Sequence, residues 1–247
     1  MPLRLCSVPV FALLVVLVLA VGALLLGSCI EPTRAEEVTP EQRLSQRIDA
    51  AAQSVRDRPD NVQRKLTLAK LLHRRGAHGH DDAANRADRM LQDLHEAHPD
   101  RPLIAAYAGA ARMMRAERTL LPWKKGELVK QGGAMIEQAL ERARETPAED
   151  ELEVRYVRAV SAASLPAWME QRELARAEFA ALAVVVSEAL EQGELAAHQG
   201  ARVLLYHAAA LREAGEIEAA KRALRKAIEL SPDTHVGAEA GAALAEL

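Results

Sequence analysis

The chain has 247 residues, of which 49% are hydrophobic, 27% charged and only 3% aromatic, and its formal net charge at pH 7 is −3. Runs of β-branched or aromatic residues are scarce after the N-terminal segment, so a β-sheet would lack its usual side chains. The near-neutral balance of charge argues against a nucleic-acid partner. The composition therefore indicates an all-α protein of one or two domains.

The first 29 residues have the pattern of a targeting segment. Arg4 precedes an almost wholly apolar run from Val8 to Leu26, and small residues follow at Gly27 and Ser28, as before a signal-peptidase site. Leu26-Gly27-Ser28-Cys29 resembles the bacterial lipobox, which implies cleavage before Cys29 and attachment of lipid to that residue. An alternative is an uncleaved anchor, because the apolar run of 19 residues is near the length that spans a bilayer.

The same resemblance divides the N-terminal part into a signal peptide, residues 1–28, and a tether, residues 29–38. Ile30, rather than Asp, follows Cys29. In a Gram-negative envelope this resembles a lipoprotein of the outer membrane that faces the periplasm. The only other cysteine, Cys6, lies within the signal peptide, so the folded part is expected to contain neither a disulfide nor a thiolate ligand. Under both interpretations we expect the chain to be tethered to a membrane of the bacterial cell envelope.

The first helix is predicted to begin at Thr39. Thr39 can act as N-cap, Pro40 suits the first helical position, and Gln42 completes a capping box. The sequence 58–60, Arg-Pro-Asp, is expected to end this helix. Its apolar face consists of residues at helical spacing: Leu44, Ile48, Ala51, Ala52 and Val55.

The segment 201–234 carries the clearest pattern. Apolar and small residues recur at three- and four-residue steps on both sides of Gly215, which predicts two amphipathic helices with a turn between them. Pro232 is expected to end the second helix. This hairpin resembles a tetratricopeptide repeat, a 34-residue helix–turn–helix unit. The resemblance rests on the residues at positions 8, 11, 15, 20, 24, 27 and 32, which are Ala208, Leu211, Gly215, Ala220, Leu224, Ala227 and Pro232.

Residues 62–101 show the same pattern. Positions 7, 8, 11 and 15, counted from Val62, are Leu68, Ala69, Leu72 and Gly76. Pro59 and Pro99 lie 40 residues apart, six more than one repeat. We place the six extra residues in the turn between the two helices, residues 77–82.

Between the two best repeats the pattern is looser, but helical hairpins continue. The sequence predicts helices over 102–118 and 127–145, one that a capping box at Thr146 starts and that ends before Leu165-Pro166, and one over 170–192. Trp123, in the interruption 121–126, is expected to be buried beneath its loop, with Trp168 as its counterpart. Three arginines are expected to be solvated or paired with Glu151, Glu153 and Glu173, namely Arg155, Arg158 and Arg172.

These elements amount to one leading helix, four hairpins and a trailing helix over 236–247. The predicted fold is therefore all-α: an α-solenoid of tetratricopeptide-like helical hairpins over residues 39–247. The trailing helix is expected to cap the apolar edge of the last hairpin, as the ends of stacked repeats require.

The resemblance to tetratricopeptide proteins implies a concave groove lined by the first helix of each hairpin. Its positions 2, 5, 9, 12 and 13 correspond to Gln63, Leu66, Lys70, His73 and Arg74 in the first repeat, and to Arg202, Leu205, Ala209, Arg212 and Glu213 in the last. Such a groove is mildly basic with apolar patches, which suits an acidic or carboxylate-ended peptide. Chaperone-binding members have Asn at positions where this chain has Thr67 and Lys70, or Tyr206 and Ala209, so their ligand does not carry over.

The sequence thus predicts a membrane-anchored, non-catalytic scaffold that binds a partner protein or peptide, with no catalytic residues, no metal and no cofactor. Two alternatives remain open. His73, His78 and His80, with Asp81 and Asp82, have the donor types of a metal site, which would allow a metal-binding protein or a metal-dependent enzyme that uses the His78/His80 loop. End-to-end stacking of repeats would give a homo-oligomeric structural protein.

Overall fold

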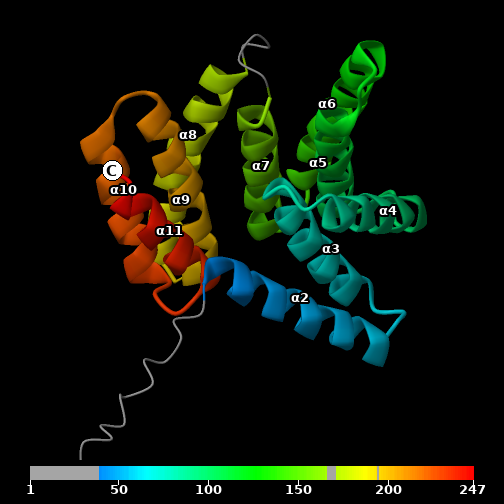
Figure 1. Cartoon of the computed structure of the whole chain (residues 1–247), viewed down its shortest axis with the longest axis horizontal. Helices are drawn as coiled ribbons and strands as arrows, with labels where there is room; N and C mark the ends of the chain where they lie inside the picture. The colour runs from blue at the N-terminus through cyan, green and yellow to red at the C-terminus, as the bar shows by residue number, and fades with distance from the viewer. Residues whose placement is uncertain (1–38, 166–170, 194) are drawn as a thin grey trace, which may run out of the picture. The chain divides into compact units, whose positions relative to one another are not determined.

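The computed structural model describes residues 39–165, 171–193 and 195–247, which belong to one compact unit that begins at Thr39. Their regular structure consists of ten α-helices without a strand (Figure 1). The predicted all-α class is confirmed. The predicted signal peptide, tether and lipid-bearing Cys29 lie outside the described residues, as does Trp168.

None of the helices in the described ranges combines the length and the apolar character needed to cross a bilayer.

The described helices form a leading helix, four hairpins and a trailing helix, as predicted. Each helix packs against the next one in the chain, which gives a solenoid of helical hairpins. The leading helix is α2 (Pro40–Asp57) and the trailing helix is α11 (His235–Ala245). The hairpins are α3 (Val62–Ala77) with α4 (Asp81–Ala97), α5 (Pro102–Arg118) with α6 (Pro122–Ala143), α7 (Ala148–Ala163) with α8 (Arg172–Glu191), and α9 (Ala197–Glu213) with α10 (Ile217–Leu230).

Local signals in the sequence fix the start of α2. The Thr39 hydroxyl oxygen accepts a hydrogen bond from the backbone N–H of Gln42 at 3.2 Å. The Gln42 side-chain oxygen accepts one from the backbone N–H of Thr39 at 2.7 Å, which completes the predicted capping box. The helix then buries Leu44 and Ile48 in the core.

Small residues occupy the close helix crossings of the two best repeats. Ala69 and Ala87 are fully buried between α3 and α4, and Ala208 and Ala220 are buried between α9 and α10. Gly215 has a φ of 80°, which favours glycine, and ends the first helix of the last hairpin as predicted.

The predicted long turn at residues 77–82 is wrong. The turn contains only residues 78–80, because Asp81 and Asp82 form the first turn of α4, where acidic side chains stabilise a helix N-terminus. Gly76 lies inside α3, and a Cβ atom there would be 2.7 Å from the Ala84 Cβ atom. The absence of a side chain at Gly76 therefore allows α3 and α4 to pack closely. Gly79, with a φ of 91°, forms the turn between them.

Three further predictions in the middle of the chain are wrong. Pro122 is the first residue of α6 rather than a break, because proline suits the first helical position. Trp123 therefore lies in the first turn of α6 and is 72% exposed instead of buried. Thr146 does not cap α7, because its hydroxyl donates a hydrogen bond to the Ala143 carbonyl oxygen at 2.7 Å, at the end of α6.

The ion pairs of α7 and α8 differ from the prediction in their glutamate partners, all of which lie on a neighbouring helix. The Arg172 side chain is exposed, as the alternative of a solvated arginine predicted. Arg155 Nε is 2.7 Å from Glu178 Oε1, and Arg158 Nε is 2.7 Å from Glu137 Oε1. Arg172 pairs with Glu213 at 4.0 Å. Tertiary packing therefore decides these pairs, rather than proximity in the sequence.

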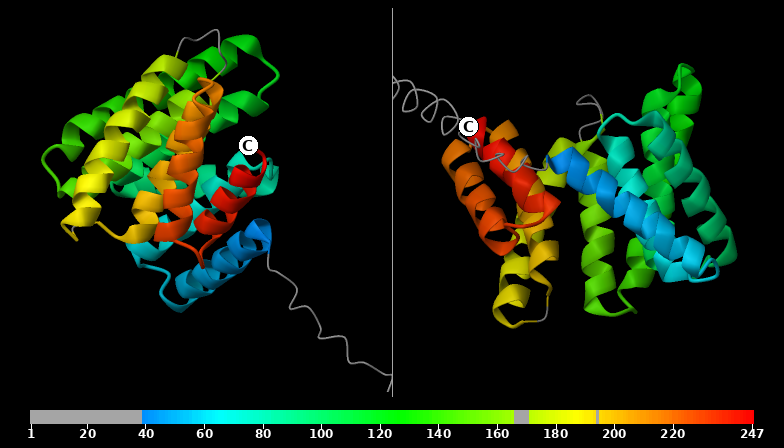
Figure 2. Two further views of the ribbon diagram at one scale, coloured as in Figure 1. Left: turned by 90° about the vertical axis from the view of Figure 1, so that its left-hand side faces the viewer. Right: turned by 60° about the horizontal axis from the view of Figure 1, so that its bottom comes forward.

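The trailing helix covers the last hairpin, as predicted, and it also contacts the leading helix. α11 packs against α10 and α9 on one side and against α2 on the other, so the first and last helices of the described domain lie side by side (Figures 1 and 2). The Arg43 side chain donates a hydrogen bond to the Asp233 carbonyl oxygen, at 3.1 Å, across this contact. An open array of repeats would leave these two helices apart.

Candidate functional site

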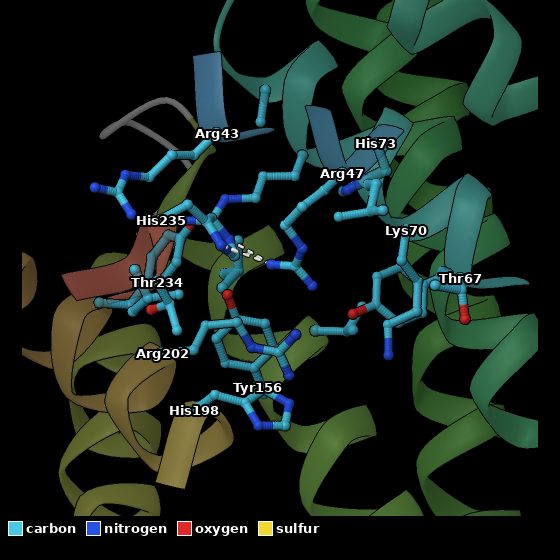
Figure 3. Close-up of a pocket in the computed structure, with 18 of the residues that line it drawn as sticks. Arg43, Arg47, Thr67, Lys70, His73, Tyr156, His198, Arg202, Thr234 and His235 are labelled. Carbon is cyan, nitrogen blue, oxygen red and sulfur yellow. Dashed lines mark hydrogen bonds between the residues drawn. The ribbon is translucent and has the colours of Figure 1, made fainter. Parts of the chain in front are cut away.

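A cavity of about 740 Å³ lies on the inner side of the helical array. Its walls come from the first helix of every hairpin, α3, α5, α7 and α9, together with α2 and the start of α11. Figure 3 shows side chains from these elements converging on the cavity. Its size is typical of a pocket that binds a small molecule or a few residues of a peptide.

Four of the ten predicted groove residues line this cavity. They are Lys70, His73, Arg74 and Arg202. The structure places Leu66 and Leu205 in the hydrophobic core instead, because these leucines contribute to the buried contacts of the array. Gln63 and Arg212 are exposed outside the cavity, and Arg212 Nη1 lies 3.4 Å from Glu246 Oε2. Ala209 and Glu213 line a second, smaller pocket of about 180 Å³.

The buried carboxylate of Glu153, on α7, holds one wall of the cavity together. One carboxylate oxygen lies 2.9 Å from Lys70 Nζ and accepts a hydrogen bond from the Tyr107 hydroxyl at 2.5 Å. The other oxygen pairs with Arg202. Burial alone would raise the pKa of Glu153, but Arg202 and Lys70 outweigh it and lower the pKa to about 2. Glu153 is therefore ionised at neutral pH and saturated by its three partners.

All three tyrosines of the chain line the cavity. Tyr107, Tyr156 and Tyr206 come from the first helices of successive hairpins and lie 49 and 50 residues apart in the sequence. The Arg202 guanidinium lies 4.3 Å from the centre of the Tyr156 ring, and Lys70 Nζ lies 5.1 Å from that of Tyr107, as in cation–π contacts. Burial raises the pKa of all three hydroxyls. This regular spacing in an aromatic-poor chain is a signal that could have identified the site.

The end helices contribute charged groups that the sequence analysis did not assign. Arg47 Nη1, on α2, lies 2.6 Å from His235 Nδ1, at the start of α11. Arg74 Nη1, on α3, lies 2.6 Å from His235 Nε2, and the same guanidinium pairs with Glu239 on α11. Burial, Arg74 and Arg47 lower the pKa of His235 to about 3, so its ring is neutral. Periodicity could not reveal a contact between residues that are 188 positions apart.

Positive charge exceeds negative charge around the cavity. Among the described residues, the cations are Arg47, Lys70, Arg74 and Arg202, and the carboxylates are Asp233 on the lining with Glu153 and Glu239 behind it. His73 is neutral as well, because burial lowers its pKa to about 4.

Two buried guanidinium nitrogen atoms of the lining also have no partner among the described residues, namely Arg74 Nε and Arg202 Nε. Buried donors of this kind are stabilised by an acceptor, and a negatively charged acceptor would also offset the excess of positive charge.

The residues of the predicted metal loop lie apart from the cavity lining. His78 ends α3, and His80 precedes α4 with its Nε2 atom 3.2 Å from Glu41 Oε1. Within residues 39–165, 171–193 and 195–247, no group of three His, Cys, Asp or Glu side chains is placed to hold a metal ion.

The cavity thus combines excess cations, unpartnered donors and aromatic walls, and it suits an anionic ligand with an apolar part. Comparison of the chain with protein-family models, with curated proteins and with solved structures found no match.

Proposed function

We propose that the chain is a non-catalytic binding scaffold of the tetratricopeptide type, anchored to the bacterial envelope through lipid on Cys29. Its cavity binds an acidic or carboxylate-ended segment of a partner protein. The observation that carries the proposal is the cavity itself, where, among the described residues, the cations Arg47, Lys70, Arg74 and Arg202 outnumber the carboxylates and buried guanidinium donors lack acceptors.

The state of the titratable groups favours binding over catalysis. A general base needs a pKa near the working pH and a free lone pair. Glu153 has a pKa of about 2, and its oxygens are engaged by Lys70, Arg202 and Tyr107. His73 and His235 have pKa values of about 4 and 3, so neither ring exchanges protons readily at neutral pH. The same groups provide fixed charges and donors for an anion.

The resemblance to tetratricopeptide repeats supports a peptide as the ligand. The lining comes from the first helices of the hairpins, on the inner side of the array, where proteins of this architecture present an extended binding surface. Tyrosine rings beside the cations offer apolar contact to the side chains that flank an acidic residue.

We expect the full-length chain in detergent to bind a fluorescent tetraglutamate peptide with a free terminal carboxylate. A tetraglutamine peptide with an amidated end should not bind. Lys70→Gln should weaken binding roughly tenfold, because a hydrogen bond to a charged group contributes about 1.5–3 kcal/mol. Fluorescence anisotropy at low salt measures both effects. Lys65→Gln, on the same helix but outside the cavity lining, is the matched control. Equal binding of the two peptides would exclude the cavity as a site for acidic segments.

The membrane anchor gives a separate expectation. The mature chain should remain with membranes through a high-salt wash and leave only with detergent, because two or more acyl chains bury enough methylene groups for stable anchoring. Cys29→Ala should abolish labelling with a lipid precursor. Recovery of the wild-type chain in the soluble fraction, or of Arg4 at the mature N-terminus, would contradict the cleaved lipoprotein.

A further inference from the structure

Three side chains meet at the corner of the cavity where the two ends of the described domain come together. Arg47 comes from α2, Arg74 from the last turn of α3, and His235 from the first turn of α11. Figure 3 shows Arg47 and His235 pointing toward each other across the cavity wall. Arg202 of α9 and Arg43 of α2 line the same cavity.

The contacts among these three side chains cannot all be hydrogen bonds. Every guanidinium nitrogen is a donor, and a neutral imidazole has a single acceptor nitrogen. Arg47 Nη1 lies 2.6 Å from one ring nitrogen of His235, and Arg74 Nη1 lies 2.6 Å from the other. Whichever nitrogen carries the proton, one guanidinium faces an N–H group. The described residues therefore do not supply all the acceptors that this corner needs.

The charges at this corner are also incompletely balanced. Arg74 pairs with Glu239, whereas Arg47 has no carboxylate within ion-pair distance among the described residues. Protonation of His235 would add a further positive charge, and burial together with Arg74, Arg47, Arg202 and His198 opposes it. One additional negative charge placed between Arg47 and Arg74 would reduce the repulsion between the two guanidinium groups.

The buried guanidinium donors without a partner indicate which kind of anion this corner would bind. Arg74 Nε and Arg202 Nε are buried and have no hydrogen-bond partner among the described residues. A guanidinium group binds a planar or tetrahedral oxyanion through two parallel N–H donors. A compact group with at least two oxygens and a negative charge, such as a carboxylate or a phosphate, therefore fits this corner better than a halide ion or a neutral carbonyl.

From these observations we propose that Arg47, Arg74 and His235 form an oxyanion subsite that joins α2 to α11. The subsite rests on the proposed function in one respect: the anionic group of the proposed peptide ligand would enter the same cavity. Two of the three residues lie on the leading and trailing helices, outside the four hairpins.

Binding at this subsite tightens the contact between the two ends of the domain. Because Arg47 and His235 come from the two end helices, an oxyanion held by both binds the arrangement with these helices in contact more strongly than one with them apart. A ligand shifts a conformational equilibrium by the difference of its affinities for the two states. The anion should therefore slow the opening of α2 and of α11 together, and leave helices far from the subsite unchanged.

Hydrogen–deuterium exchange on the full-length chain in detergent tests this subsite, with inorganic phosphate and succinate as the probes. Each probe is compared with chloride at matched ionic strength. We expect slower exchange in residues 40–57 and 235–245 and no change in residues 122–143. The two probes distinguish the sources of the oxyanion, because a phosphate-specific subsite responds to the first and a carboxylate-specific one to the second.

Variants of α2 separate the subsite from general charge effects. Arg47→Gln should raise the probe concentration for half-maximal protection at least tenfold. Arg47→Lys, which keeps the charge but not the paired donors, should retain part of the response. Arg56→Gln removes the same charge from an exposed position of the same helix and should respond like the wild type. Helical circular dichroism of each variant verifies the fold.

The outcomes distinguish this inference from the proposed function. Protection by chloride equal to that by both probes, or equal responses of Arg47→Gln and Arg56→Gln, would overturn the subsite. If Lys70→Gln weakens peptide binding and Arg47→Gln does not, the result supports the peptide site and contradicts the oxyanion subsite. If phosphate or succinate protects both end helices while no acidic peptide binds, the subsite stands and the proposed class of partner falls.

Discussion

Replacing Glu153 with glutamine should lower the free energy of unfolding by about 3–5 kcal/mol, the usual cost of leaving buried ion-pair partners uncompensated. The carboxylate is buried and holds Lys70, Arg202 and the Tyr107 hydroxyl. Glutamine keeps the shape but removes the charge, so the buried Arg202 guanidinium and the Lys70 ammonium lose their shared counter-charge. Urea unfolding followed by circular dichroism measures the change.

A matched variant and the pH dependence test the cause of this loss. Glu151, two residues earlier in α7, forms no ion pair with any residue in the described ranges, so Glu151→Gln should change stability by less than about 0.5 kcal/mol. Equal losses for the two variants would contradict the role of the buried carboxylate.

The pKa of Glu153 is about 2 in the folded chain and 4.5 in the reference state. Because the folded value is lowered, its stabilising contribution is fully present above pH 4.5 and is lost as the pH falls toward 2. Stability of the wild type should fall in this window by about 3 kcal/mol more than that of Glu153→Gln.

Two adjacent glycines of α6 should respond in opposite directions to alanine. A Cβ atom at Gly132 would lie 2.5 Å from the Gly109 carbonyl oxygen and 2.6 Å from Met113 Cγ, where α5 and α6 cross. Because backbone atoms cannot move aside cheaply, Gly132→Ala should destabilise the chain by about 1–3 kcal/mol. Thermal and urea unfolding of the purified variant measure this loss.

Gly133 provides the control for this crossing. A Cβ atom at Gly133 meets no heavy atom within 4 Å, and alanine is a better helix former than glycine. Gly133→Ala should therefore stabilise the chain by about 0.5–1 kcal/mol. Stabilisation by both variants would mean that helix propensity, and not the crossing, determines the effect at Gly132.

Much of the fold could be predicted because local chemistry marks the helices. Thr39 with Gln42, the positive φ of Gly215 and the apolar period of each helix are properties of neighbouring residues. The errors arose where local signals had two meanings. Pro122 could break a helix or begin one, and it begins α6. Thr146 could cap the next helix, yet its hydroxyl bonds to the preceding one.

The candidate site could be predicted only where it belongs to the repeats. Lys70, His73, Arg74 and Arg202 occupy positions that repeat spacing assigns to the inner surface. Glu153 resembles the many exposed glutamates of the chain, and only the packing of α7 against its neighbours makes it a buried counter-charge. Arg47 enters the site because α2 contacts α11, and no local pattern encodes that contact.

The contact between α2 and α11 also changes how the domain comes apart. In a linear array, stability is a sum of nearest-neighbour terms, and each end frays independently of the other. Here a hydrogen bond links Arg43 and Asp233, which are 190 positions apart in the sequence. The first and last helices are therefore also nearest neighbours, and the stability of one depends on the other. Unfolding of either end helix exposes the surface of the other. The two segments of the described domain that are farthest apart in the sequence should therefore unfold as one cooperative unit. Forming this unit requires the largest loop closure in the domain, so the ends should dock only after the hairpins between them have folded.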